Sequence, residues 1–215
     1  MSVGGGLAYG ALGASHHATE DIAVMRALPG MTVVAPGDPI EADLATRALV
    51  ARAGPAYLRL GKSGEPAVHS DGVNFQIGKA VRVTDGDDVT LIATGTMLYA
   101  TVQAAEQLAR EGIGARVVSM HTIKPLDGEA VFEAARETRA IITVEEHSII
   151  GGLGSAVAEV LAESADCHVR FKRMGLPSAF TGVGSREFLT RSYSLSIEGI
   201  VESAMQILEL APSRA

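Results

Sequence analysis

The sequence predicts an α/β fold in which a mostly parallel sheet is covered by helices on both faces. Short apolar runs rich in Val and Ile alternate with helical segments of about 10 to 15 residues, which is typical of βαβ units. The 215 residues include 24 glycines and only 4% aromatic residues, which favours tight turns and a core of Ala, Val and Ile. A hydrophobic content of 47% with 20% charged residues is enough for a packed core and argues against disorder.

Residues 1–62 contain two clear strands and two helices. Thr19 is expected to cap the first helix, which a Pro-Gly pair ends, and the run MTVVAP that follows predicts a buried strand. The second helix begins with Asp38 as its cap and Glu41 in a capping-box position, and it leads into the strand PAYLRL. So few strands cannot bury both faces of a sheet or hide its edges. This segment therefore lies against the larger domain or takes its missing strands from another chain.

Residues 63–76 are rich in Gly, Ser and Pro and are interpreted as a linker. Residues 77–215 form a larger domain with roughly five strands and four helices. Its first two strands, IGKAVRV and DVTLIATG, flank the turn TDGDD and predict a β-hairpin. The later elements are helices from about Thr96 to Glu111, Gly128 to Glu137, Leu153 to Glu163 and Ile197 to about Leu210 (capped by Ser196), and the strands ARVVSM, AIITVEE and HVRFKRM.

The net charge of −7 argues against nucleic acid or an anionic membrane as the general partner. It still permits a phosphorylated substrate in a locally positive pocket. The single cysteine, Cys167, cannot form an internal disulfide, and at a predicted strand start beside His168 it is expected in the core. Neither a secretory signal nor a run of about 18 apolar residues is visible, so we expect a cytoplasmic protein without a membrane segment.

Two adjacent histidines, His16 and His17, occupy a glycine-bracketed loop just before the first helix. A loop histidine that packs or bonds backbone is the simplest explanation. A neutral imidazole before a helix start can instead donate to a substrate oxygen or move protons. His16 and Glu20 also have the i, i+4 spacing of metal ligands, but no third ligand is evident, and no metal site is predicted.

Arg59 and Lys62 lie at the end of the strand PAYLRLGK. They are either edge charges in water or a phosphate-binding pair at the carboxyl end of a strand. The glycines after VEEHSII do not complete a dinucleotide fingerprint, because Val157 occupies the last position of the motif. NAD binding is therefore not expected.

Six segments, taken in order along nearly the whole chain, resemble the C-terminal section of transketolase. They are GASHHATEDIAVMRALPGMTVVAPGDPIEAD, PAYLRLGK, VTLIATGTM, MHTIKPLD, VEEHSIIGGLGSAVAE and FTGVGSREFLTRSYSLSIEGI. The Ser-His-His variant followed by ATED is most similar to split transketolases, in which separate N- and C-terminal chains make one enzyme. The resemblance implies that residues 1–62 are the C-terminal part of a pyrimidine-binding domain. It also implies that residues 77–215 are the family's C-terminal domain, a mixed five-stranded sheet used mainly in dimer contacts.

The resemblance also implies roles for site residues. Ser15-His16-His17 matches the family's Thr-His-Gln loop, so His16 is expected to be catalytic and to bind substrate oxygen or phosphate together with His17. Lys62 stands where transketolases have a phosphate-binding arginine, and Arg59 is expected to compensate. The glutamate that activates thiamine diphosphate and the motif that holds magnesium and diphosphate are not found in this sequence. Both cofactors are therefore expected to be held mainly by a partner chain or a missing segment.

The function implied is that of the C-terminal subunit of a transketolase-type transferase of carbohydrate metabolism. With an N-terminal subunit it would transfer a two-carbon ketol unit between sugar phosphates, and it would form a homodimer through its C-terminal domain. Two alternatives stay open at this point: a non-catalytic dimerisation or scaffold fragment, and the β subunit of a 2-oxo acid dehydrogenase.

Overall fold

The computed structural model describes residues 1–70, 72–164 and 168–209. The strands are β1 (Ser2–Val3), β2 (Thr32–Val34), β3 (Ala56–Leu60), β4 (Val81–Thr84), β5 (Val89–Ala93), β6 (Ala115–Ser119), β7 (Thr122–Lys124), β8 (Ala140–Ser148) and β9 (Arg170–Leu176). The α-helices are α1 (Asp21–Ala27), α2 (Pro39–Val50), α3 (Leu98–Arg110), α4 (Gly128–Glu137), α5 (Leu153–Ala162), α6 (Arg186–Ser192) and α7 (Ile197–Glu209). Short 3₁₀ turns are η1 (Gly10–Leu12), η2 (Ala14–His16) and η3 (Gly95–Met97).

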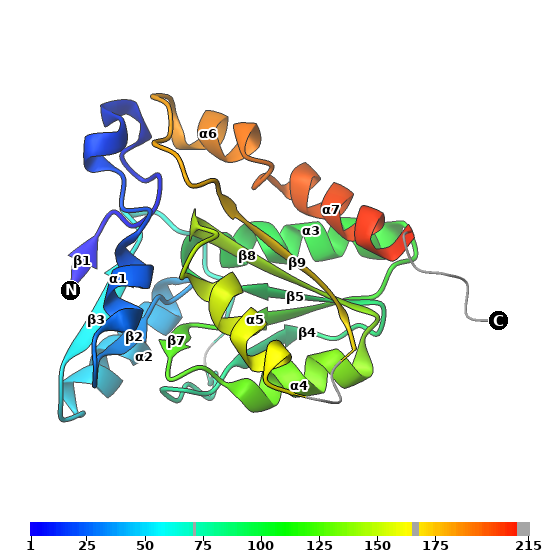
Figure 1. Ribbon diagram of the computed structural model, residues 1–215, viewed down its shortest axis with the longest axis horizontal. Coiled ribbons are helices and arrows are strands. Elements are labelled where there is room, and N and C mark those ends of the chain that lie inside the picture. Colours follow the sequence, from blue (N-terminus) through cyan, green and yellow to red (C-terminus); the bar gives the residue numbers. More distant parts are fainter. Residues whose placement is uncertain (71, 165–167, 210–215) are drawn as a thin grey trace.

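The larger domain is built on a five-stranded mixed sheet in the order β4-β6-β5-β8-β9. Strand β4 is antiparallel to β6 and the other pairs are parallel, which confirms the predicted mixed α/β sheet. Helices α3 and α7 cover one face, and α4 and α5 cover the other (Figure 1). The buried strand β5 divides its side chains between the two cores: Leu91 packs in the cluster with α3 and α7, whereas its neighbour Ile92 packs with α4 and α5.

The predicted hairpin between residues 77 and 94 is wrong. Strands β4 and β5 are not neighbours, because β6 lies between them. The TDGDD segment is bound to the residues that lead into β6. Asp88 exchanges backbone and side-chain hydrogen bonds with Gly114, at 2.9 and 2.8 Å, and a Cβ on Gly86 would lie 2.5 Å from the Ala115 backbone. The segment thus spans the start of β6 instead of closing a two-stranded turn.

The N-terminal segment forms a second sheet with the order β1-β3-β2-β7. Its last strand belongs to the larger domain: β7 pairs antiparallel with β2, with Val33 opposite Lys124 and Val34 opposite Thr122. Figure 1 shows β7 beside β2 at the junction of the two units. The two units also pack together through an apolar cluster in which Ile22 and Val33 lie with Ile123. Of the two arrangements expected from the sequence, the structure has the segment lying against the larger domain.

Local signals at helix starts were mostly correct. The Asp38 Oδ1 accepts a hydrogen bond from Glu41 N at 2.7 Å, and Ser196 Oγ accepts one from Gly199 N at 3.3 Å. The predicted Thr19 cap is wrong: α1 has Glu20 at its N-cap without a side-chain cap, and the Thr19 hydroxyl donates to the Glu20 carboxylate at 2.7 Å. Strands β1 and β7 and helix α6 were not expected from the sequence. Cys167 and Leu210, which the sequence placed in the core and at a helix end, lie outside the described residues.

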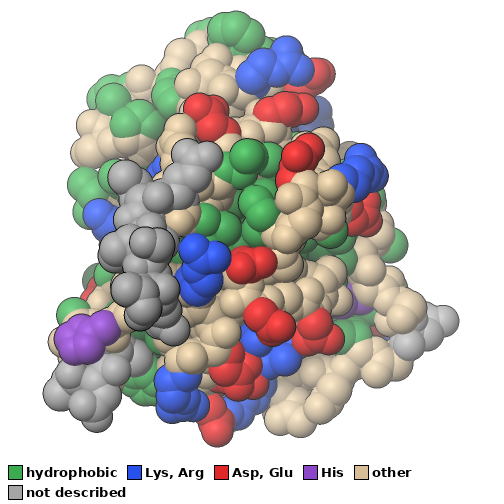
Figure 2. All heavy atoms as spheres, turned by 90° about the vertical axis from the view of Figure 1, so that its right-hand side faces the viewer, with side chains coloured by type: hydrophobic (Ala, Val, Ile, Leu, Met, Phe, Trp, Pro, Cys, Tyr) green, Lys and Arg blue, Asp and Glu red, His purple; other side chains and the backbone are tan. Residues whose placement is uncertain are grey.

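Figure 2 shows the end of the molecule that faces away from β1. Acidic and basic side chains are interspersed on this face, and the part of it that the structure describes carries no extended basic patch. Within residues 1–70, 72–164 and 168–209, none of the helices combines the length and the hydropathy that crossing a bilayer demands.

Candidate substrate site around the histidine loop

The two sequence-predicted histidines lie in a closed loop, residues 7–17, which we call the histidine loop. Its neck is an antiparallel bridge between Gly6 and Ala18, with N–H···O distances of 2.9 and 3.0 Å in the two directions. Gly6 has a φ of +67°, a conformation that favours glycine. The turns η1 and η2 fold the chain back on itself inside the loop.

His16 ends η2, and its side chain is exposed. The Ser15 hydroxyl lies 3.0 Å from His16 Nδ1, which leaves Nε2 as the ring nitrogen available to a ligand. His17 is half-buried, and its Nδ1 is hydrogen-bonded to the hydroxyl of Thr181. Its Nε2 is buried and has no partner among the described residues. The two rings therefore have different surroundings, as neighbouring side chains on a loop usually do.

Arg59 lies beneath the loop and is only 4% exposed. Its Nε donates to the Asp21 carboxylate at 2.8 Å, and its Nη2 donates to the carbonyl oxygens of Ala18 at 2.8 Å and Glu146 at 3.0 Å. Burial alone would raise the pKa of Asp21, but the Arg59 charge and the Tyr57 hydroxyl outweigh burial and lower it. The pKa of Tyr57 is raised to about 12 by its own burial and by that hydrogen bond. The guanidinium thus supports the loop from inside the protein.

Lys62 is exposed at the end of β3. Its ammonium lies 5.3 Å from the centre of the Tyr9 ring, a cation–π contact with the histidine loop. The same residue borders a small cavity of about 160 Å³ that Gly37 and Asp38 also line. The structure therefore brings Lys62 beside the loop that holds His16 and His17, whereas Arg59 lies below it.

Two consecutive glutamates at the end of β8 are fully buried, and the sequence analysis did not assign them roles. Glu145 accepts backbone hydrogen bonds from Leu153 at 2.7 Å and Gly154 at 2.8 Å, at the start of α5. Burial raises the pKa of Glu145 to about 7, and the two N–H donors only partly oppose it. Glu146 instead accepts from Leu7 N, the first residue of the histidine loop, at 2.6 Å.

Asp38, Glu41 and His69 bring potential metal-ligand atoms within 4.8 Å of one another. Protein donors already occupy their carboxylate oxygens: the Ser119 hydroxyl at 2.7 Å and His69 Nε2 at 2.8 Å both contact Glu41 Oε1. Burial would lower the pKa of His69, but the hydrogen bond and charge of Glu41 outweigh it and raise the pKa. This cluster ties the segment after β3 to α2 and β6.

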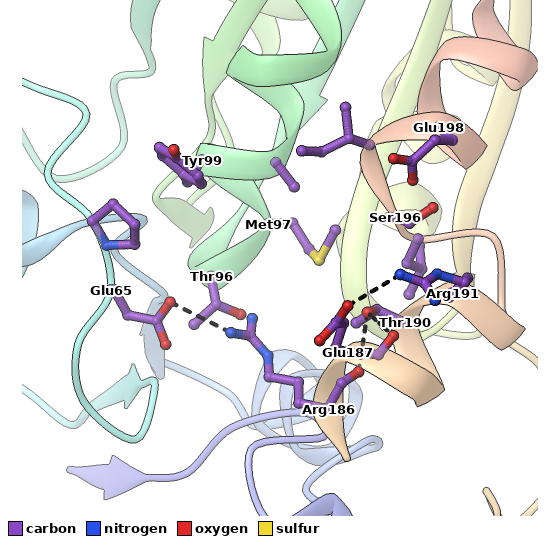
Figure 3. A pocket seen from close by; sticks show the side chains of 14 residues that line it. Glu65, Thr96, Met97, Tyr99, Arg186, Glu187, Thr190, Arg191, Ser196 and Glu198 are labelled. Carbon is purple, nitrogen blue, oxygen red and sulfur yellow. Dashed lines mark hydrogen bonds and ion pairs between the residues drawn. The ribbon is translucent and has the colours of Figure 1, made fainter. Parts of the chain in front are cut away.

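A larger cavity of about 490 Å³ lies between the segment after β3, the start of α3, and helices α6 and α7. Figure 3 shows Arg186 reaching from α6 toward Glu65, with Thr96 beside it, and Arg191 turned toward Glu187. The two ion-pair distances are 3.5 and 3.0 Å. This cavity could not be expected from the sequence, because α6, a helix of seven residues that lines it, was not predicted.

Comparison with known proteins agrees with this arrangement of two units. The family model of the transketolase pyrimidine-binding domain matches residues 1–66, and that of the transketolase C-terminal domain matches residues 78–200. The chain therefore belongs to the transketolase family, and the resemblance inferred from its sequence is confirmed.

Individual relatives are similar over most of this chain. It is 42% identical over 210 residues to an apulose-4-phosphate transketolase subunit of Phocaeicola vulgatus, covering 97% of this chain and 66% of that protein. It is 41% identical over 197 residues to the 6-deoxy-6-sulfo-D-fructose transketolase subunit SqwH of Clostridium sp. strain MSTE9, and this match covers 92% of this chain and 61% of that protein. A solved structure described as a split gene transketolase, inactive β4 tetramer, superposes with a TM-score of 0.82 at 40% sequence identity. This match covers 98% of this chain and 66% of the solved chain. The chain thus spans 61% to 66% of the length of these relatives.

Proposed function

We propose that this chain is the C-terminal subunit of a transketolase-type transferase that moves a two-carbon ketol unit between sugar phosphates together with an N-terminal partner subunit. The observation that carries the proposal is the histidine loop of a transketolase-family scaffold, which carries the exposed imidazole of His16 and whose Tyr9 ring is contacted by the exposed ammonium of Lys62. The relatives named as transketolase subunits, similar over more than nine-tenths of this chain, support it.

Within this proposal each of the four residues His16, His17, Arg59 and Lys62 has a separate task. His16, through Nε2, hydrogen-bonds a hydroxyl or carbonyl oxygen of the donor sugar and accepts or returns its proton. His17, whose ring is half-buried beside His16, provides a second contact for the substrate. Lys62 attracts the substrate phosphate as a point charge. Arg59, which the sequence analysis assigned to the phosphate, instead holds the loop backbone at Ala18.

Transketolases depend on thiamine diphosphate, and the residues of the histidine loop do not fit that cofactor by themselves. Residues 7–17 include no carboxylate that could bond an aminopyrimidine ring. The buried carboxylate that reaches the loop, Glu146, is occupied by Leu7 and Arg186. We therefore assign thiamine diphosphate and its magnesium mainly to the partner chain or to a segment outside this sequence.

We also propose that the partners of this chain are an N-terminal transketolase subunit and a sugar phosphate substrate. The chain would form a homodimer through its C-terminal domain and be located in the cytoplasm. A relative described as an inactive β4 tetramer, which shares 40% identity, is compatible with a chain that is inactive without its partner.

The test is reconstitution with an N-terminal transketolase subunit, thiamine diphosphate and magnesium, followed by a ketol-transfer assay on sugar phosphates. We expect activity from the pair and none from this chain alone. His16→Ala should lower kcat/KM by about 10² to 10⁴ because a positioned acid–base group is lost. Lys62→Ala should raise KM about tenfold because a phosphate contact is lost, whereas Lys79→Ala, an exposed lysine paired with Glu129, serves as the matched control.

If the reconstituted pair transfers no ketol unit, the proposal is wrong. Two other results would replace it with a specific alternative. Self-association without activity would indicate a scaffold fragment, and activity with pyruvate and lipoamide would indicate the β subunit of a 2-oxo acid dehydrogenase.

A further inference from the structure

The neck of the histidine loop rests on a residue of the C-terminal domain. Glu146, in β8, is 1% exposed, and its Oε1 accepts the backbone N–H of Leu7 at 2.6 Å. The contact between the two units is close: a Cβ on Gly6 would lie 2.7 Å from Glu146 Cγ and 2.8 Å from its carbonyl oxygen. Glycine at this position lets the loop backbone pack directly on Glu146.

The other end of the loop reaches the same residue through Arg59. The guanidinium Nη2 donates at once to the carbonyl of Ala18 and to the carbonyl of Glu146, at 2.8 and 3.0 Å. Leu7 and Ala18, which bound the loop, are thus both fixed relative to one residue of β8. A change in the position of Glu146 would move both ends together.

Glu146 is itself held in place by two donors. Arg186 Nη2 lies 2.6 Å from its Oε2, and the Thr96 hydroxyl donates to the same oxygen at 2.9 Å. Arg186 also pairs with Glu65 across the cavity drawn in Figure 3. Charge-assisted bonds in a buried setting are short and directional, so the carboxylate is well fixed.

The loop itself is also held by the segment that leads into α6. Gly184 N donates to the carbonyl of Gly10 at 3.1 Å, and Thr181 is hydrogen-bonded to His17 at the end of the loop. The neck and the loop are therefore both attached to the C-terminal domain.

We propose that Glu146 is a positioning residue for the reaction: through Leu7 and Arg59 it fixes the histidine loop, and with it the place of His16. This inference rests on the proposed function, and it gives the C-terminal domain a role in the reaction. Glu146 acts on the loop and does not contact the substrate.

The first test follows the loop directly, in this chain alone. In Glu146→Gln an amide replaces the carboxylate, so the bond to Leu7 N loses its charge and the ion pair with Arg186 disappears. Native-state amide exchange at pH 6, read by NMR, should become about tenfold faster at Leu7 and Ala18. Amides of the central strand β5 should be unchanged. The His16 ring resonances should shift as well.

The adjacent Glu145→Gln is the matched control. It is another buried glutamate of β8, but its carboxylate caps α5 and makes no hydrogen bond to the loop. Loop exchange should equal that of the parent. Thr96→Val removes one donor to Glu146 at nearly constant volume and should increase loop amide exchange less than Glu146→Gln does. If Glu146→Gln does not fold, Thr96→Val provides the test in its place.

The second test uses the reconstituted pair. A misplaced catalytic group costs rate, so kcat/KM should fall about tenfold to a hundredfold in Glu146→Gln and stay within about twofold of the parent in Glu145→Gln. Unchanged loop exchange in both Glu146→Gln and Thr96→Val, or unchanged kcat/KM in Glu146→Gln, overturns the positioning role. Absence of ketol transfer in the parent pair overturns the proposed function instead, and loop exchange and the His16 resonances then still decide whether Glu146 holds the loop.

Discussion

The buried carboxyl of Glu145 should contribute stability in mild acid that is lost in mild base, and Glu145→Gln should remove this contribution. The ordinary pKa of a glutamate is 4.5, and burial raises that of Glu145 to about 7. The folded state therefore holds the proton more tightly than the unfolded state. The resulting stability is fully present below the unfolded pKa of 4.5 and is lost as the pH rises through about 7.

The size of the effect follows from the two pKa values. At about 1.4 kcal/mol per pH unit, a pKa of about 7 against 4.5 corresponds to about 3 kcal/mol in total. Most of it, about 2.5 kcal/mol, should be lost between about pH 5 and pH 8. Glutamine has the size of the protonated acid and does not ionise, so the variant lacks this loss. Any constant cost of its amide group cancels when the two pH values are compared.

The measurement is urea unfolding of the parent and Glu145→Gln at pH 5 and pH 8. The parent should lose about 2.5 kcal/mol more than the variant between these values. Glu159→Gln is the control, because Glu159 lies on the neighbouring helix α5 with its side chain 59% exposed, and its profile should follow the parent. Parallel profiles for the parent and Glu145→Gln would show that Glu145 is ionised in the folded protein, and the reasoning would be refuted.

Three further changes test packing and pairing. Gly6→Ala should destabilise the fold by about 2 kcal/mol or more, because the new methyl group meets Glu146. Gly30→Ala, at a similar φ but with open space around it, should cost only about 1 kcal/mol. Equal losses of unfolding free energy for the two variants in urea would contradict the close approach of Gly6 to Glu146. Leu91→Ala, at a fully buried position of β5, should cost about 3 kcal/mol, and a loss below about 1 kcal/mol would show that the core there is loose. In an NMR titration the pKa of His69 should lie above its ordinary 6.5 and fall in Glu41→Gln; a value at or below 6.5 in the parent would contradict the pairing.

Features set by neighbouring residues could be predicted from the sequence. The cap at Asp38 depends on a donor three residues away, and α4 has the bounds Gly128–Glu137 that were expected from the sequence. The mixed sheet of the larger domain was predicted as well, but through the family resemblance and not from strand patterns. The pattern alone predicted a hairpin, because nothing in residues 77–94 indicates that β6, more than twenty residues later, enters between β4 and β5.

The site was predictable only in part for the same reason. A pair of histidines in a glycine-bracketed loop is a local signal, so the loop was found. Its support was not, because Glu146 lies 139 residues from Leu7 in the sequence. Arg59 was predicted to face the phosphate from its position at a strand end. The fold turns that end against Asp21 and Ala18, and the sequence near Arg59 contains no indication of this.

Because of strand β7, the boundary between the two units in space does not coincide with their boundary along the sequence. The chain crosses from one unit to the other through residues 63–76, yet residues 122–124 return to complete the first sheet. A protease cut within 63–76 would therefore leave two fragments that stay associated through a shared ladder of backbone hydrogen bonds. Residues 1–62 produced alone would expose the unpaired edge of β2, a surface prone to aggregation. Dissection of this protein for expression should keep both units in one polypeptide.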